Sequence, residues 1–365
     1  MTGAEPPAER AAGPPAGLAA ERAAGPPAGL AAERAAGPAA GLARFLGEQW
    51  GRPVRVSGLD ASSTGARRAN LAFDAHCDGR PARRLVATIV PTAAIQINPV
   101  GAEAAVRSLA RAHGVPVPEV VAWSEDPSWV GGPFFLSEWI GGETVPRQVL
   151  RLIERRGLGD RVAAQLGVAM ARLHRIDPDR APAGLADPGA GAPAAIALAG
   201  VTLAVEGLVE PRPALTYGLG WLEDRRPEAP DRPSIVHSDI RTGNLIVADD
   251  GLRAVLDWEG ARRRGDPMED LAWLALRMWR FRNDVLEVGG FARLDALVEA
   301  YERAGGSFDR DRYRWWKVLG TLKWALGLAG QAAGHIDGSF RSIVMAASGR
   351  RVPEMEWDLL MLVRP

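Results

Sequence analysis

The sequence has little cysteine and little lysine. Its 365 residues include one cysteine, Cys77, which excludes an internal disulfide and a zinc site built from several cysteines. Lys317 and Lys323 are the only lysines, against 42 arginines. Any role before residue 317 that usually requires a lysine must therefore be filled by another residue.

Net charge and long hydrophobic runs are also missing. The formal net charge is zero, and no run approaches the ~18 apolar residues of a membrane span. Neither property favours a nucleic-acid or a membrane partner. The N-terminus MTGAEPPAER lacks the basic region and apolar stretch of a secretory signal. We therefore expect a cytoplasmic protein that binds neither nucleic acid nor membrane.

A 12-residue repeat occupies residues 8–43. AERAAGPPAGLA occurs twice and is followed by AERAAGPAAGLA. Each copy contains a Gly-Pro pair, which interrupts helices, and a single leucine, so the repeat can bury little apolar surface. We predict that residues 1–43 form a flexible extension that adds nothing to the folded body. A docking segment for another protein is the alternative.

Residues 235–259 read IVHSDIRTGNLIVADDGLRAVLDWE and carry the chemistry. Phosphoryl transfer by kinase-like enzymes needs a carboxylate that orients and deprotonates the acceptor hydroxyl, and oxygen ligands that hold Mg²⁺ on the nucleotide phosphates. Asp239 suits the first role, whereas Asn244 and Asp257 suit the second. Two apolar runs around a turn at 248–251 predict a hairpin that brings the two metal ligands together. A hairpin with unrelated polar ends is the alternative.

Other residues of this segment receive supporting roles. Arg241, two residues after Asp239, is a candidate for steadying the transferred phosphate, or else braces the loop. We expect His237 to hold the loop by packing and hydrogen bonding. Farther along, Asp270 has helical spacing to apolar neighbours and is expected to brace the loop from beneath.

The segments HSDIRTGN, LDWE and GDPMEDLAWL resemble the aminoglycoside phosphotransferase and choline-kinase-like family, in its broad bacterial branch. The similarity covers roughly residues 50–345, and Ser238 stands where the family usually has glycine. It implies an α+β, bilobal, protein-kinase-like fold. A small β-rich nucleotide-binding lobe would occupy residues 44–140, and a large helical lobe with the catalytic loop and acceptor site would occupy 141–365. It also implies a phosphotransferase that uses ATP or GTP with Mg²⁺.

Apolar patterns in the first lobe predict five strands and one packed helix at 102–113. A short helix is expected at 42–51, and the Ala-, Gly- and Pro-rich residues 181–200 are expected to be a loop. The phosphate-covering turn should include Ser63, Thr64 and Gly65, whose backbone N–H groups can face phosphate. By resemblance, Glu138 C=O and Ile140 N–H would contact the base. A plain turn and a plain strand end are the alternatives.

The largest departure from the family pattern is Thr88. Kinase-like enzymes place a cation on the third strand and pair it with a helix glutamate. This strand reads LVATIV, so Glu103 loses its expected partner. Arg67 or Arg68 could reach in from the phosphate turn. Arg84 would lie about 13 Å along the strand from Thr88 and is a poor substitute.

The acceptor side, residues 261–365, has 17 basic and 14 acidic residues. This excess of cations disfavours a polycationic aminoglycoside. Trp273 and Trp279 are expected on one helix with Arg277 and Arg280, either to bind flat or sugar-like molecules or as packing core. The leading hypothesis is a kinase acting on a hydroxyl of a small molecule. The alternative is a kinase-fold protein without phosphotransfer, because Thr88 replaces the strand cation.

Overall fold

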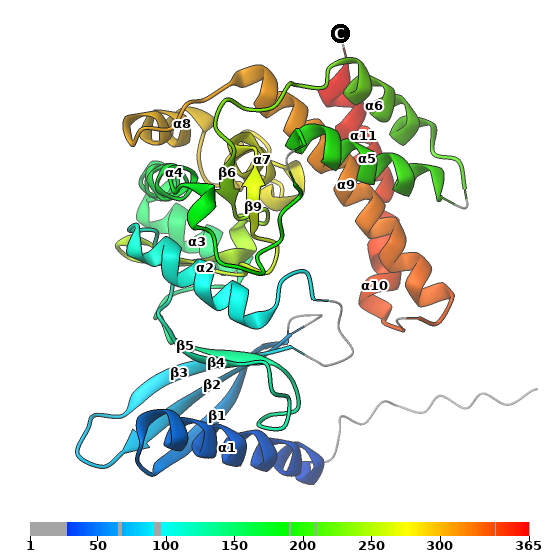
Figure 1. Ribbon diagram of the computed structural model, residues 1–365. Helices are drawn as coiled ribbons and strands as arrows, with labels where there is room; N and C mark the ends of the chain where they lie inside the picture. Colours follow the sequence, from blue (N-terminus) through cyan, green and yellow to red (C-terminus); the bar gives the residue numbers. More distant parts are fainter. Residues whose placement is uncertain are drawn as a thin grey trace, which may run out of the picture.

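The computed structural model describes residues 28–64, 68–90, 96–189, 191–208, 210–339 and 341–364. It confirms the α+β bilobal prediction, since a five-stranded sheet forms one lobe and helices dominate the other (Figure 1). In the described part of the chain, no helix is both long and apolar enough to cross a membrane.

The sheet of the N-terminal lobe is antiparallel throughout, with the strand order β1-β2-β3-β5-β4. Helix α1 packs on one face, where Phe45 lies edge-on to Phe134 with ring centroids 4.9 Å apart. Leu46, Phe73 and Leu85 complete this core and are essentially buried. The strands are β1 (Val54–Thr64), β2 (Ala69–Cys77), β3 (Arg83–Ile89), β4 (Val120–Ser124) and β5 (Phe134–Glu138).

Helix α1 runs from Ala28 to Trp50, so the predicted flexibility of residues 1–43 is wrong for the third copy of the repeat. Pro38 lies inside the helix, although an interior proline costs about 3 kcal/mol. The alanines around it are strong helix formers, and the fully buried Leu42 anchors the helix on the sheet core. Residues 1–27 lie outside the described residues.

Helix α2 (Val100–Ala112) lies between the sheet and the C-terminal lobe (Figure 1). Its Val106 and Ala110 share a buried cluster with Leu173 and Trp258 of the other lobe. Polar contacts reinforce this junction, because the buried Asn98 side chain donates to Glu259 O at 2.9 Å and to Ala261 O at 2.8 Å. The segment that follows Asp257 is thereby held against the start of α2.

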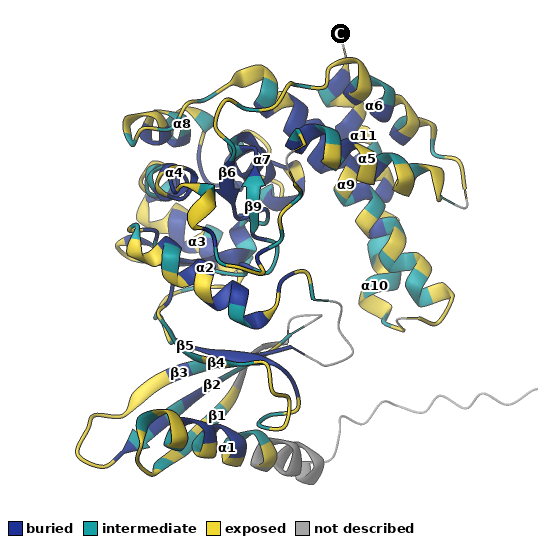
Figure 2. Ribbon diagram, in the orientation of Figure 1, coloured by how far each residue is buried: buried dark blue, intermediate teal, exposed yellow. Residues whose placement is uncertain are grey.

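The C-terminal lobe is built around β6 and α7, which are almost entirely buried (Figure 2). Two short antiparallel pairs, β6 (Ser234–Val236) with β9 (Arg262–Gly265) and β7 (Leu245–Ala248) with β8 (Gly251–Val255), interrupt the helices. The helices are α3 (Pro146–Arg156), α4 (Gly159–His174), α5 (Pro193–Glu206), α6 (Pro213–Asp224), α7 (Pro267–Leu274), α8 (Leu294–Arg303), α9 (Arg310–Ile336), α10 (Ile343–Ser348) and α11 (Val352–Val363).

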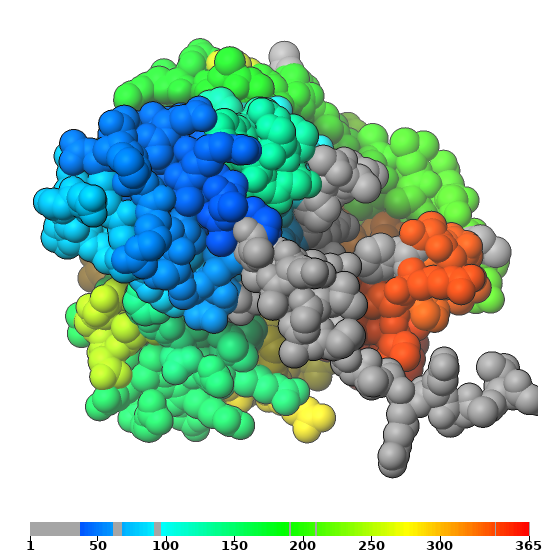
Figure 3. Space-filling model, turned by 90° about the horizontal axis from the view of Figure 1, so that it is seen from below, coloured from blue at the N-terminus to red at the C-terminus, as the bar shows by residue number. Residues whose placement is uncertain are grey.

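Residues 181–200 are not all loop, because α5 begins at Pro193. Proline is well suited to the first turn of a helix, and the alanines and leucines that follow favour helix over loop. Helix α9 is the longest element of this lobe, and its C-terminal end carries α10 away from the lobe's centre (Figure 1). Seen from the N-terminal lobe, the orange α10 end and the blue sheet lobe stand apart on the same face (Figure 3).

Candidate active site

The loop at 237–241 is fixed from beneath by Asp270 of α7. One carboxylate oxygen of Asp270 accepts from His237 N at 2.8 Å, and the other accepts from Ser238 N at 2.6 Å. His174 Nε2 lies 3.1 Å from the first oxygen. Burial alone would raise the pKa of Asp270, but His174, His237 and these hydrogen bonds hold it below its ordinary value. The expected bracing role of Asp270 is confirmed.

His237 holds the loop, as predicted. Its Nδ1 accepts from Asp239 N at 3.2 Å, so its Nε2 is left to donate to Leu256 O at 3.0 Å. The ring is completely buried and tilts against Trp258, with centroids 4.6 Å apart. His237 thereby links the loop to the end of β8, where Asp257 lies.

Ser238 and Gly243 show how the backbone of this loop is constrained. Ser238 has φ of 71°, a left-handed conformation that is costly for residues with a Cβ, and the family's glycine would adopt it freely. At Gly243 a Cβ would lie 2.6 Å from Arg241 Nη1, so the absence of a side chain leaves room for the guanidinium. The serine is therefore more than a neutral replacement, because it stores strain beside Asp239.

The Asp239 carboxylate is held by three side chains. Oδ1 accepts from Trp273 Nε1 at 2.7 Å, and Oδ2 accepts from Asn244 Nδ2 at 2.8 Å. Arg241 Nε lies 3.2 Å from both oxygens, while its guanidinium lies over the Trp279 ring at 5.2 Å. Asp239 is still 26% exposed, so a substrate hydroxyl can reach it. These contacts fix the orientation of the Asp239 carboxylate and leave part of it exposed to solvent.

Asn244 and Asp257 lie at the open end of the β7–β8 hairpin, as predicted. Leu245 pairs with Val255, and Leu256 N donates to Asn244 O at 2.8 Å. Asn244 Nδ2 donates both to the carboxylate and to the backbone oxygen of Asp239, so its Oδ1 is left for another partner. Asp257, with φ of 64°, accepts no hydrogen bond from the described residues.

This donor set fits magnesium, which prefers oxygen ligands and keeps several from water or phosphate. The described residues contain no group of three or more His, Cys, Asp and Glu side chains suited to a metal. One amide oxygen and one carboxylate at a hairpin end therefore suit a metal that phosphates share, and not one held by protein ligands alone.

Arg68, and not a residue of β3, pairs with the α2 glutamate. Thr88 Oγ1 donates to Asn70 Oδ1 at 2.8 Å on the neighbouring strand. Directly before that strand, Arg68 Nη1 lies 2.8 Å from Glu103 Oε2, and its Nε lies 2.9 Å from Glu259 Oε2. Burial opposes its charge, but Glu103, Glu259 and Asp257 raise the pKa of Arg68 above its ordinary value. Glu103 has therefore not lost its partner.

A second arginine lies one helical turn after Glu103. Arg107 is buried, and its guanidinium lies over the Phe135 ring at 4.4 Å. Burial lowers the pKa of Arg107 to about 10, which leaves it charged at neutral pH. By contrast, Arg84 pairs with Asp74 at 2.9 Å on the outer part of the sheet, which agrees with its rejection from sequence.

The structure describes some of the other residues that were predicted to bind the nucleotide, and not all of them. Glu138 ends β5, and among the described residues Ile140 N makes no backbone hydrogen bond, which leaves it available to a ligand. The Glu138 side chain accepts from Glu119 N at 2.8 Å and pairs with Arg111 at 3.0 Å. The backbones of Ser63 and Thr64 end β1, while Gly65 and Arg67 lie outside the described residues.

Trp273 and Trp279 do not share a helix. The first ends α7 and the second lies in a 3₁₀ turn, η3 (Arg277–Arg280), because α7 stops at Leu274. Their rings nevertheless lie 5.8 Å apart, and Trp324 of α9 contacts both edge-on. The contact of Trp273 with Asp239 was not predicted from the sequence, although one signal for it exists. The three-residue spacing from Asp270 is the signal, since it places both on the face of α7 that meets the loop.

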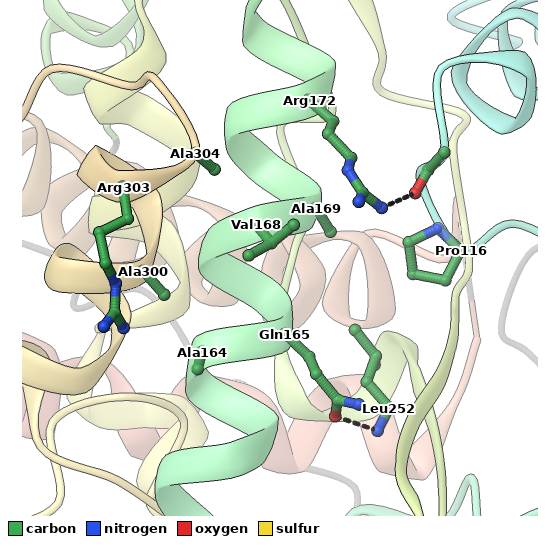
Figure 4. A pocket seen from close by; sticks show the side chains of 11 residues that line it. Pro116, Ala164, Gln165, Val168, Ala169, Arg172, Leu252, Ala300, Arg303 and Ala304 are labelled. Carbon is green, nitrogen blue, oxygen red and sulfur yellow. Dashed lines mark hydrogen bonds between the residues drawn. The ribbon is translucent and has the colours of Figure 1, made fainter.

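A cavity of about 500 Å³ lies elsewhere, between α4 and α8 (Figure 4). At its edges Arg172 donates to Gly114 O at 2.6 Å, and Gln165 accepts from Leu252 N at 2.8 Å. None of the predicted site residues lines it. The candidate active site is therefore the surface around Asp239, Asn244 and Asp257 and not this cavity.

Comparisons with known proteins agree with this architecture. The model of the phosphotransferase enzyme family matches residues 70–316. Acyl-CoA dehydrogenase family member 10 of Mus musculus is 26% identical over 275 residues, which are 69% of this chain and 24% of that protein. The chain thus spans about a quarter of the length of this curated relative.

Solved structures share the fold. A Ralstonia eutropha protein described as an aminoglycoside phosphotransferase superposes with a TM-score of 0.66 at 22% identity, covering 89% of this chain and 98% of its own. Aminoglycoside phosphotransferase APH(4)-Ia, in complex with ADP and hygromycin B, gives 0.59 at 18% identity, covering 89% and 99%. APH(2")-IIIa with GDP and kanamycin gives 0.60 at 16% identity, covering 86% and 98%.

Proposed function

Because the chain belongs to the phosphotransferase enzyme family, we propose that it is a small-molecule kinase that transfers the γ-phosphate of ATP or GTP to a hydroxyl group. The observation that carries this proposal is the Asp239 carboxylate, oriented by Trp273, Arg241 and Asn244 yet still exposed. The ADP and GDP bound to its structural neighbours support a nucleotide as phosphate donor. Use of these nucleotides favours a cytoplasmic location.

Asp239 acts on the acceptor. The acceptor hydroxyl donates a hydrogen bond to its carboxylate, which points the oxygen lone pair at the γ-phosphorus. As the new P–O bond forms, the bond between that phosphorus and the oxygen bridging to the β-phosphate breaks, and the proton passes to Asp239 late in the transfer. Arg241 faces the same point and offsets negative charge there.

Asn244 and Asp257 would hold magnesium through the Asn244 Oδ1 and the Asp257 carboxylate. The metal, when bound, neutralises charge on the donor phosphates. The amide of Asn244 contacts Asp239 through its nitrogen, so one residue orients both the carboxylate and the metal ligand. That coupling supports a shared role for the two residues.

Arg68 would bind the donor phosphates in place of a cation on β3. It meets the two requirements of that role: it pairs with the α2 glutamate, Glu103, and it lies near Asp257. Its contacts with Glu103 and Glu259 use Nη1 and Nε, and a guanidinium carries five N–H donors, so further donors can face phosphate oxygens. This arrangement counts against the alternative of a kinase fold without phosphotransfer, which depended on the loss at Thr88.

The remaining nucleotide contacts are part of the same proposal. The backbone at Ser63, Thr64 and Gly65 would cover the phosphates, with Arg67 beside them. Glu138 C=O and Ile140 N–H would contact the base. An unpaired Ile140 N–H at the end of β5 supports this assignment.

The test is nucleotide binding followed by transfer. Calorimetry with ADP, GDP, ATP and GTP, each with and without MgCl₂, should give micromolar to millimolar dissociation constants that weaken without the metal. Phosphate release from the preferred triphosphate should then fall in Asp239→Asn while its ADP affinity stays unchanged. If no nucleotide binds at 5 mM with MgCl₂, the kinase proposal is wrong and the alternative stands.

A further inference from the structure

The side of Asp239 away from the metal ligands is formed by tryptophans and one exposed lysine. Trp273, Trp279 and Trp324 contact one another, and Lys323 Nζ lies over the Trp273 ring at 5.6 Å. Trp273 also donates to Asp239, so a single indole connects the carboxylate with the lysine. A ligand whose hydroxyl meets Asp239 would extend across this surface toward Lys323.

Charges around this surface do not cancel. Asp239 is paired with Arg241, and Glu269 is paired with Arg262. Lys323 has no ion pair within 4 Å among the described residues. Its pKa is lowered, mainly because surrounding protein desolvates the ammonium, with Glu269, Arg262 and Asp239 as the charged neighbours. The Lys323 side chain is exposed, so an anion in solution can reach it.

The two carboxylates near Lys323 are already paired with arginines, whereas Lys323 itself is exposed. The exposed surface therefore offers one surplus cation. A polycationic acceptor would find nothing to neutralise its charge.

We propose that the acceptor is an anionic hydroxyl compound, with its hydroxyl at Asp239 and a negatively charged group at Lys323. This inference rests on the proposed kinase function and specifies its substrate class. A carboxylate and a phosphonate would satisfy Lys323 through the same chemistry, because an ammonium is a compact point charge.

Three probes of one shape test the charge preference: 4-(hydroxymethyl)benzoate, 4-(hydroxymethyl)benzamide and 4-(hydroxymethyl)benzylamine. They share a ring and a hydroxyl and carry charges of −1, 0 and +1. The expected order of kcat/KM for phosphate-ester formation follows that charge, with the benzoate about tenfold above the amide, the size of a charged hydrogen bond. The corresponding phenylphosphonate shows which anion Lys323 prefers.

Variants of the two lysines test whether Lys323 causes the order of kcat/KM among the three probes. Lys323→Gln should abolish the preference for the benzoate, whereas Lys323→Arg should keep most of it. Lys317→Arg is the matched control, because Lys317 pairs with Glu287 and should leave the order unchanged. Equal rates for the three probes, or a preference for the benzylamine, would overturn the inference while leaving the kinase function standing.

Binding can be read without turnover, since the chain has only two lysines. Reductive methylation with ¹³C-formaldehyde keeps the lysine charge and gives NMR signals that the two lysine variants assign. The benzoate should shift the Lys323 signal and not the Lys317 signal, and the benzylamine should shift neither. Absence of a Lys323 shift with the benzoate overturns the proposal. A Lys323 shift without any ester product would instead refute the kinase function and leave the anion site intact.

Discussion

The catalytic loop and the nucleotide side of this protein differ in how closely they follow the family pattern. In the loop, Asp239, Asn244 and Asp257 hold the positions that the pattern predicts. On the nucleotide side β3 carries Thr88, and Glu103 pairs instead with Arg68, which lies just before β2. The side-chain pair with Glu103 persists, although one of its members comes from another strand.

The difference reflects what each group has to do. A catalytic base must meet the acceptor hydroxyl in one direction, so the role proposed for Asp239 calls for a fixed backbone and orienting partners. A phosphate-binding cation needs only to bring positive charge to one place, and a long arginine can reach that place from more than one backbone position. The base therefore has to occupy one position in the sequence, whereas the phosphate-binding cation can come from several positions.

The largest expected effect comes from a change in the catalytic loop that leaves the nucleotide side intact. Asp239→Asn keeps the shape but removes the charge, and the rate of phosphate release should fall about 10²- to 10⁴-fold. ADP affinity by calorimetry should not change, because the phosphates contact other residues. Asp249→Asn, on the exposed turn of the same hairpin, is the control and should retain full turnover. Equal turnover in the two variants would remove Asp239 from the mechanism.

The next largest effect is expected from a change on the nucleotide side that leaves the catalytic loop intact. Arg68→Gln should weaken ADP and ATP binding about 10- to 100-fold, as expected for a lost charged hydrogen bond. It should also lower Tm, because Glu103 is left buried without its ion pair. Adding Glu103→Gln should restore Tm but not affinity. Arg84→Gln, whose arginine pairs on the exposed sheet edge, is the control. Unchanged affinity in Arg68→Gln would assign Arg68 a purely structural role.

A third change tests whether the cation can be moved back. Thr88→Lys in the Arg68→Gln background should regain on the order of fivefold to tenfold of the lost nucleotide affinity, about 1–1.4 kcal/mol. The position faces Asn70 and lies on the strand where the family carries its basic residue. In the presence of Arg68 the same lysine should not improve binding, because two cations would then compete for Glu103. A gain in both backgrounds would show that the two positions are not equivalent.

The smallest effect concerns the strain in the loop. Ser238→Gly should raise the free energy of unfolding by about 0.5 kcal/mol, since relief of a left-handed residue, worth ~1–2 kcal/mol, is partly offset by the entropy of glycine. Chemical denaturation can measure the change. Ser238→Ala removes the buried, unpartnered hydroxyl but keeps the Cβ, so it separates strain from polar burial. An equal gain in Ala would attribute the cost to the hydroxyl.

The family resemblance predicted the fold, and local patterns predicted the hairpin and the brace of the catalytic loop. The hairpin at 245–255 needs only two apolar runs and a turn, and Asp270 needs only helical spacing to its neighbours. The roles of Asp239, Asn244 and Asp257 in catalysis stay predictions, but their placement agrees with the structure. Local patterns failed where tertiary packing decided: α1 extends through Pro38 because its far end is anchored by Leu42.

Contacts between segments that are distant in the sequence were harder to predict. Nothing in the sequence distinguishes Arg67 from Arg68 as the partner of Glu103, because the contact joins segments 35 residues apart. The contact of Trp273 with Asp239 joins residues 34 positions apart and depends on where α7 ends. Such contacts are determined by how α7 and α2 pack, and periodicity does not report packing between elements.

The Arg68 ion pairs also bear on how the two lobes move. Arg68 belongs to the sheet lobe, whereas Glu259 follows Asp257 in the helical lobe, so one guanidinium bridges the two. A hinge motion that separates the lobes must break the Arg68–Glu259 pair or carry Arg68 away from Glu103. With Arg68 in the role proposed for it, the same residue would bind the donor phosphates and link the two lobes, so lobe opening and nucleotide release would depend on one guanidinium.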